Sequence, residues 1–153
     1  MNASANLFDV SVWIALAFSS HPHHRIAKIE FDNKDSHLPA AFCRATQQAF
    51  VRILSTPVVQ KLYGSPIITN EMAWQKYEMM QALPQVVWLD EPQGLEAVWR
   101  KFACRASASP KIWMDAYLAA FDLNHRIPIV TLDEDFLKFP GVSVKFLLAA
   151  GKF

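Results

Sequence analysis

Short apolar runs alternate with longer amphipathic segments along the whole chain. The runs have the length and composition of buried strands, and most of them end beside an acidic residue. The segments between them carry apolar residues at helical spacing. This alternation is typical of a parallel sheet with helices on both faces, so the sequence predicts an α/β fold. The predicted strands cover residues 7–8, 38–42, 86–89, 127–132 and 142–144.

Capping residues and prolines set the expected helix limits. Pro57 is expected to close the third helix. Ser109 suits the N-cap of the last long helix and Pro110 its first position. An apolar tail, residues 146–150, is expected to pack on the body or at a dimer contact. The predicted helices cover residues 10–18, 25–31, 44–55, about 70–83, 92–106 and 109–122.

Composition bounds the class of protein. The chain has 153 residues, 52% of them hydrophobic, which suits one domain over residues 1–153 with a substantial core. Its net charge of +1 argues against a histone-like mode of nucleic-acid binding but leaves room for a local basic groove. No apolar run is long enough to span a membrane, and no signal peptide is evident. Cys43 and Cys104 form neither a disulfide framework nor a zinc spacing, so we expect a cytoplasmic protein.

Asp115 stands out within the last long helix. Ala119 lies one turn further along, so the carboxylate borders the apolar face that should be buried. A carboxylate held there is costly unless it is paired or binds a metal ion. The alternative is an acid favoured near the start of the helix by the helix dipole. The helix alone does not decide between these interpretations.

Other acids follow the predicted strands. Asp9 ends the first strand and Asp133 the fourth, with Asp135 just beyond. Because parallel strands end at one edge of a sheet, Asp9, Asp133 and Asp115 can converge there. Carboxylates at a few ångströms repel one another, and a divalent cation relieves the repulsion. Oxygen ligands suit Mg²⁺, with Mn²⁺ possible, and such an ion positions a phosphodiester and activates water.

Four stretches then carry a family resemblance. The segments around Asp9 (LFDVS), Asp115 (WMDAYLA) and Asp133 (VTLDEDF) resemble the first, third and fourth motifs of PIN-domain ribonucleases. Residues 43–54 resemble the helix after the second strand in VapC-type toxins of bacterial toxin–antitoxin pairs. The resemblance implies a three-layer α/β/α sandwich with a mainly parallel sheet. It also implies Mg²⁺-dependent endoribonuclease activity, a homodimer, and inhibition by a cognate antitoxin protein.

One position departs from the family pattern. Many members carry a Glu in the second motif, and the matching position here is Gln47. An amide can hold a metal-bound water or an RNA group but adds no charge. We therefore expect Asp9, Asp115 and Asp133 to hold the metal, with Gln47 as a further site residue and weaker metal binding than four carboxylates would give.

Several alternatives remain open at this stage. The fold could bind RNA or a protein without cleaving it, or it could be a receiver-like phospho-acceptor domain using Asp9 and Asp90. Asp135 suits either the site or a loop cap. Trp113 either stacks an RNA base or packs. Ser11 and Thr131 are candidates for orienting a carboxylate or water. The candidates for RNA phosphate contacts are Arg44, Arg52, Lys111 and Arg126.

Overall fold

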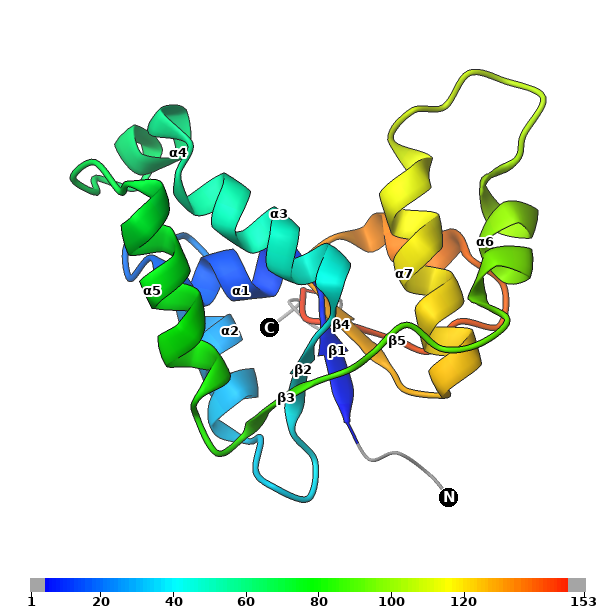
Figure 1. Cartoon of the computed structure of the whole chain (residues 1–153), viewed down its shortest axis with the longest axis horizontal. Helices are drawn as coiled ribbons and strands as arrows, with labels where there is room; N and C mark the ends of the chain where they lie inside the picture. Colours follow the sequence, from blue (N-terminus) through cyan, green and yellow to red (C-terminus); the bar gives the residue numbers. More distant parts are fainter. Residues whose placement is uncertain (1–4, 149–153) are drawn as a thin grey trace.

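Five short strands form the central sheet, and each neighbouring pair in it is parallel (Figure 1). The computed structural model describes residues 5–148. The strand order is β3-β2-β1-β4-β5, so β1 and β4 lie side by side in the middle. The strands are β1 (Asn6–Phe8), β2 (Ala40–Phe42), β3 (Val86–Trp88), β4 (Ile129–Thr131) and β5 (Val144–Phe146).

Alternation along the central strands divides the core into two layers. Phe8 and Val130 belong to one buried cluster, while Leu7 and Ile129 belong to the other. All four side chains are fully buried. Successive side chains of a strand point to opposite faces, so both faces of this sheet need a covering layer. The predicted three-layer α/β/α sandwich with a mainly parallel sheet is confirmed.

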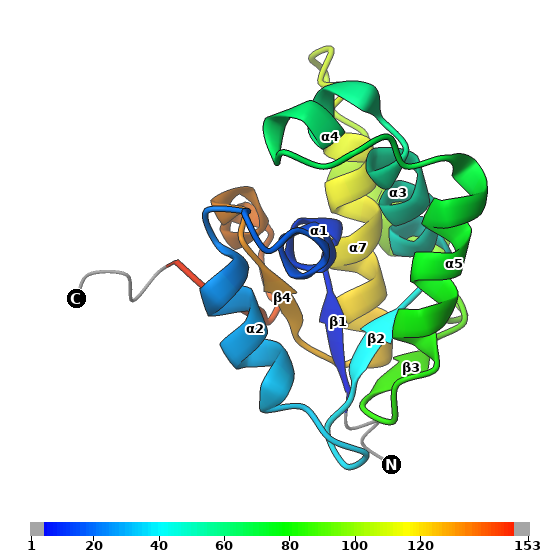
Figure 2. The same cartoon turned by 90° about the vertical axis from the view of Figure 1, so that its left-hand side faces the viewer.

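Four helices supply the first covering layer, with an aromatic core beneath them. Trp13 stacks on Phe42 with 3.9 Å between ring centroids, and Phe8 lies 5.1 Å from Trp13. Figure 2 shows one of these helices, α1, end-on beyond the end of β1. The helices are α1 (Val10–Ala17), α2 (His24–Asp32), α3 (Arg44–Leu54) and α5 (Asn70–Gln81).

The opposite layer is a pair of helices, α6 (Leu95–Ala103) and α7 (Ile112–His125), joined by a long loop (Figure 1). Ala116, Ala119 and Ala120 on α7 are buried without exposure, so small side chains bring this helix close to the sheet. A short 3-10 helix, η1 (Glu134–Lys138), follows β4. None of the helices in residues 5–148 has the length and apolar character needed to cross a membrane.

Several boundaries differ from the predictions. Helix α6 is shorter than the predicted 92–106, α7 continues to His125 rather than ending at residue 122, and β2 and β4 are shorter than the predicted strands 38–42 and 127–132. Pro57 is not simply the residue that closes α3. It is the first residue of a separate helix, α4 (Pro57–Leu62). Helix α7 begins at Ile112 rather than after Ser109, because the Ser109 carbonyl accepts from the Ile112 N–H while its hydroxyl pairs with Ser107. The last strand is displaced toward the C-terminus. Residues 149–150 of the expected apolar tail lie outside the described residues, and the single domain over residues 1–153 stays a prediction.

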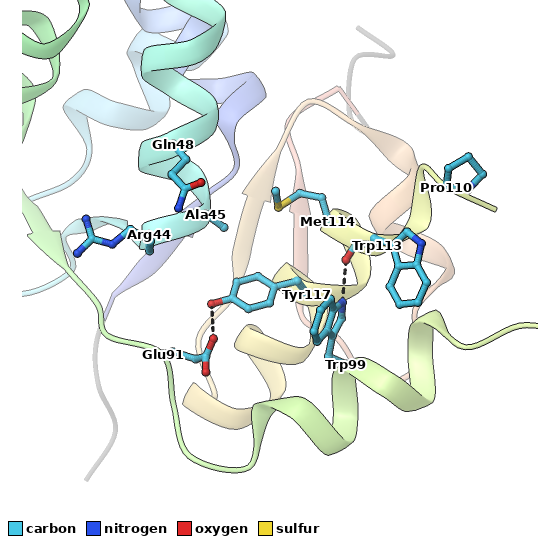
Figure 3. A pocket seen from close by; sticks show the side chains of 9 residues that line it. All are labelled: Arg44, Ala45, Gln48, Glu91, Trp99, Pro110, Trp113, Met114 and Tyr117. Carbon is cyan, nitrogen blue, oxygen red and sulfur yellow. Dashed lines mark hydrogen bonds between the residues drawn. The ribbon is translucent and has the colours of Figure 1, made fainter. Parts of the chain in front are cut away.

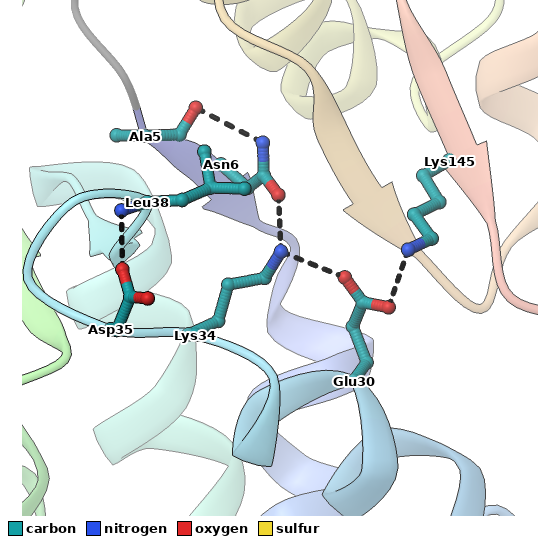
Figure 4. A network of polar contacts seen from close by, with 7 residues as sticks. All are labelled: Ala5, Asn6, Glu30, Lys34, Asp35, Leu38 and Lys145. Atoms are coloured by element: carbon teal, nitrogen blue, oxygen red, sulfur yellow. Dashed lines mark hydrogen bonds and ion pairs between the residues drawn. The ribbon is translucent and has the colours of Figure 1, made fainter.

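A buried ion cluster fastens α2 to the sheet (Figure 4). Lys34 Nζ lies 3.0 Å from Glu30 Oε2 and donates to Asn6 Oδ1 at 2.6 Å. Lys145 on β5 pairs with the other Glu30 oxygen at 2.6 Å. Glu30 and Lys34 are both buried. Because each buried charge has an opposite partner, the cluster links α2 to β1 and β5 without leaving a bare ion in the core.

Asp122 is a second acid on α7, two helical turns after Asp115, and it is buried. Its Oδ1 accepts from the Ser143 N–H at 3.4 Å, and its Oδ2 has no hydrogen-bond partner. Burial raises the pKa of Asp122 to about 7, against the opposing effect of backbone hydrogen bonds from Ser143 and Ile129. This carboxyl therefore favours its neutral form inside the fold.

Candidate active site

Asp9 is held at the junction of β1 and α1. It is the N-cap of α1, and its Oδ1 accepts from the Val10 N–H at 2.8 Å. Its Oδ2 accepts from the hydroxyls of Ser11 at 2.8 Å and Thr131 at 2.9 Å. The carboxylate is buried, and burial raises its pKa while these hydrogen bonds oppose the rise. Both oxygens of Asp9 are thus fixed in direction before any ligand arrives.

Thr131 joins the ends of β1 and β4. Its hydroxyl donates to Asp9 and accepts from the backbone N–H of Asp133 at 2.9 Å. Ser11 supports the same corner, because its hydroxyl accepts from the Leu132 N–H at 3.1 Å. The structure therefore assigns both hydroxyls the orienting position that the sequence suggested for them.

Three carboxylates converge beside this corner. Among the described residues, Asp115, Asp133 and Asp135 each offer an oxygen within 4.8 Å of the others. Asp115 comes from the first turn of α7, and Asp133 follows β4. The Asp135 N–H donates to Asp133 Oδ1 at 2.9 Å, so one acid orients the loop that carries the other. Asp9 lies outside this group of three, and Asp135 lies within it.

The negative charges of neighbouring acids raise the pKa of Asp115 and of Asp9. Burial, together with the charges of Asp9, Asp133 and Asp135, raises the pKa of Asp115 to about 6, against a smaller opposing effect of Lys138. The charge of Asp133 acts on Asp9 in the same direction. A partly buried group of acceptor-only oxygens is the donor set that hard divalent cations use, so these residues fit Mg²⁺ or Mn²⁺.

Gln47 is held by a neighbour on its own helix. It is buried on α3, and its Oε1 accepts from Arg44 Nη1 at 2.6 Å. The next residue, Gln48, is the one that lines a cleft facing α7. The site role of Gln47 stays a prediction.

The receiver interpretation needs Asp9 and Asp90 at one place. The two residues follow β1 and β3, which are separated by β2 in the sheet. The Asp90 carboxylate also accepts from Trp88 Nε1 at 2.9 Å. Asp9 and Asp133 instead follow β1 and β4, the two strands that pair directly, and the Thr131 hydroxyl links the two residues.

Two hollows lie along the first turns of α7. The first, of about 310 Å³, is lined by Asp115 and Asp135 together with the basic residues Arg105, Lys111 and Lys138. Positive side chains around a carboxylate group are suited to a phosphate that shares a metal ion with it. Lys111 was among the basic residues expected from the sequence, but Arg105 and Lys138 were not, although Lys138 lies only three residues after Asp135.

The second hollow is a cleft of about 450 Å³ between α3 and the pair α6–α7 (Figure 3). The sequence did not indicate Glu91, Trp99 or Tyr117 as site residues, because they come to this cleft from separate segments of the chain. Its walls are formed by Arg44, Ala45, Gln48, Glu91, Trp99, Pro110, Trp113, Met114 and Tyr117.

Comparisons with known proteins agree with this fold. The PIN domain family model matches residues 7–142. Ribonuclease VapC41 of Mycobacterium tuberculosis is 44% identical over 142 residues, which are 92% of this chain and 97% of that protein. The M. tuberculosis toxin VapC20, described as cleaving the sarcin-ricin loop, has a TM-score of 0.62 at 17% identity, over 88% of this chain and 93% of that one. VapBC-1 of nontypeable Haemophilus influenzae has a TM-score of 0.65 at 13% identity, over 94% and 98%.

The family match covers β1 through the loop before β5 and includes all four acids near the site. The high identity to VapC41 extends over nearly the whole of both chains. The family resemblance noted in the sequence is therefore confirmed: this chain belongs to the PIN-domain family, among its VapC-type members.

Proposed function

We propose that this protein is a Mg²⁺-dependent endoribonuclease that acts as the toxin of a toxin–antitoxin pair, with Mn²⁺ as an alternative ion. The observation that carries the proposal is the meeting of Asp115, Asp133 and Asp135 within 4.8 Å, beside the buried Asp9. The relatives VapC41 and VapC31 of M. tuberculosis are both named ribonucleases, which supports the same reaction class.

Each acid has a proposed role in binding the metal ion. Asp9, Asp115 and Asp133 would hold the ion, with Asp135 adding charge to the group. When bound, the ion supplies an activated water and neutralises charge on the leaving oxygen. The hydroxyls of Ser11 and Thr131 donate to Asp9 and hold its carboxylate in a fixed orientation.

The basic hollow would receive the RNA backbone. Arg105, Lys111 and Lys138 line it beside Asp115 and Asp135. They can hold the phosphates flanking the cut and offset the repulsion between RNA and the acids. Gln47 is retained as a candidate site residue acting through Arg44.

The proposed partners follow from the relatives. Several structural neighbours are toxin–antitoxin assemblies, including VapBC-1 of H. influenzae and a toxin–antitoxin complex from Klebsiella pneumoniae. We infer a cognate antitoxin protein as the inhibitor, a homodimer as the assembly, and the cytoplasm as the compartment where RNA is met.

The test is RNA cleavage by the full chain with Mg²⁺, with Mn²⁺ and with EDTA. We expect cleavage with either ion, none with EDTA, and a loss of at least a hundredfold in Asp115→Asn. Asp32→Asn is the matched control, because Asp32 is an exposed acid on α2 that pairs with Lys28. Cleavage that survives EDTA, or RNA binding without any cleavage, would overturn the proposal and favour the non-catalytic interpretation.

A further inference from the structure

A third hollow is lined by the loop that joins α6 to α7, and it lies next to the basic hollow that contains Asp115 and Asp135. This loop hollow has a volume of about 430 Å³, within the range of about 300–1,000 Å³ that is usual for ligand sites. Arg105, Ser109 and Pro110 line both hollows, so the two meet at the N-terminal end of α7. A polymer bound at the acids can therefore continue into the loop hollow.

Trp113 is the aromatic side chain of the loop hollow, and 48% of its surface is exposed. Its neighbours Trp99 and Tyr117 pack against the buried cluster of this layer, but Trp113 does not belong to that cluster. Figure 3 shows the Trp113 ring beside Pro110, at the end of the aromatic cleft that lies away from Arg44. Packing in the core therefore does not explain this tryptophan.

Trp113 is nevertheless held in a fixed position. It lies in the first turn of α7, and its carbonyl accepts from Trp99 Nε1 at 2.8 Å. The two indole rings meet edge-to-face, with 5.9 Å between their centroids. Such a contact covers at most one of the two faces of the Trp113 ring, which leaves a face for a flat ligand. An aromatic surface that is both fixed and exposed is pre-organised for stacking.

The charges around the two hollows suit an RNA backbone that crosses the N-terminal end of α7. Two residues turn a helix by about 200°, so Trp113 and Asp115 point to different sides of α7. A phosphate at the acids and a base on Trp113 must therefore be linked across the start of the helix. Arg105 is the cation that lines both sides of this crossing, and Lys111 lines the side of the acids.

We propose that the loop hollow binds one unpaired base of the RNA substrate by stacking it on Trp113, next to the phosphate held at the acids. The inference rests on the proposed ribonuclease function. Arg105 pairs with the phosphate between the base and the acids. Every base has a face that can stack, and the described residues that line the loop hollow include neither a carboxylate nor an amide to choose among bases. The subsite therefore requires an unpaired base but not a particular one.

Binding of short RNAs to the full chain in EDTA tests the proposal without requiring cleavage. The probes are labelled five-nucleotide RNA backbones, one abasic throughout and two with a single central adenine or uracil, measured by fluorescence anisotropy. We expect either base to tighten binding to the wild type by about tenfold over the abasic backbone, the effect of one stacked base. Trp113→Ala should remove this gain and leave the affinity for the abasic backbone unchanged, while Trp113→Phe should keep most of the gain. Arg105→Gln should weaken binding of all three probes by a similar factor, because it acts on the phosphates.

Trp74→Ala is the matched control and should bind like the wild type, because Trp74 is a similarly exposed tryptophan on α5 in the opposite layer. The subsite would be overturned if a base gave no gain in the wild type, if the gain persisted in Trp113→Ala, or if Trp113→Ala weakened binding of the abasic backbone equally. A tenfold preference between adenine and uracil would overturn the tolerance for different bases. A gain that depends on Trp113 in a protein that cleaves no RNA would uphold the subsite and overturn only the proposed catalysis, whereas cleavage without the gain would do the reverse.

Discussion

Thr131 donates its hydroxyl proton to Asp9 across two neighbouring strands, with 2.9 Å between Thr131 Oγ1 and Asp9 Oδ2. The same hydroxyl oxygen accepts from the backbone N–H of Asp133 at 2.9 Å. One buried side chain therefore sets both the direction of one acid and the backbone position of another. The geometry of the acids depends on a residue that carries no charge.

Replacing Thr131 by Val should uncouple the two strand ends. Val keeps the shape but leaves the Asp133 N–H without its acceptor, which costs about 1–3 kcal/mol for a buried group. We expect urea unfolding to show that loss and RNA cleavage to need a higher Mg²⁺ concentration. Thr131→Ser keeps the hydroxyl and should restore the metal dependence. A Val variant with wild-type metal dependence would show that Thr131 only fills space.

Divalent ions should stabilise the folded chain through Asp115. A ligand that binds only the native state raises the melting temperature. We expect Mg²⁺ to raise the melting temperature of the wild type and of Asp32→Asn, but not of Asp115→Asn. Because the pKa of Asp115 is raised to about 6, a proton competes with the ion below that pH. The Mg²⁺ effect should shrink between pH 7 and pH 5, and an effect that is constant over this range would contradict the assignment.

Asp122 should make the protein less stable as pH rises. Its folded pKa of about 7 exceeds the value of 3.8 for a solvated carboxyl, so between these values the native state holds a proton that the unfolded state has lost. Stability must then fall with rising pH across this window. The asparagine in Asp122→Asn cannot ionise. The free energy of unfolding of this variant should therefore rise relative to that of the wild type from pH 4 to pH 8. Parallel urea-unfolding profiles for the two proteins would refute this.

The buried ion cluster that links α2 to the sheet should contribute more to the free energy of unfolding than the exposed ion pair on the same helix. Lys34→Met removes the partner of a buried carboxylate, a change that typically costs about 3–5 kcal/mol, and the remaining Lys145 places the expected loss at the lower end. Lys28→Met removes an exposed partner of Asp32 and should cost less than about 0.5 kcal/mol. The urea-unfolding midpoints of the two variants test this prediction. Equal midpoints would mean that the buried cluster adds no net stability.

The parts of the site that the sequence could predict are those fixed by position along a strand. Asp9 and Asp133 directly follow apolar runs, and parallel pairing alone brings the ends of such runs to one edge. Asp115 was detectable because it interrupts an apolar helical face. Asp122 carries the same signal two turns later on that face, and the same periodicity would have found it.

The rest depends on contacts between distant segments. A proline such as Pro57 is compatible with the end of a helix or with the first position of a new one. In the structure Pro57 begins a new helix, α4. Ser109 suits an N-cap, but its hydroxyl bonds to Ser107 and the helix begins later. The cleft wall formed by Glu91 and Tyr117 requires tertiary packing that local patterns do not encode.

The division of the core into two layers has a consequence for when activity can exist. Asp9 caps a helix of one layer, while Asp115 is carried by a helix of the other, and the sheet lies between the two layers. A chain in which either layer has come loose has no complete set of acids. The proposed ribonuclease activity would then require both layers to be folded on the sheet, so a nascent or partly degraded copy would not cleave RNA.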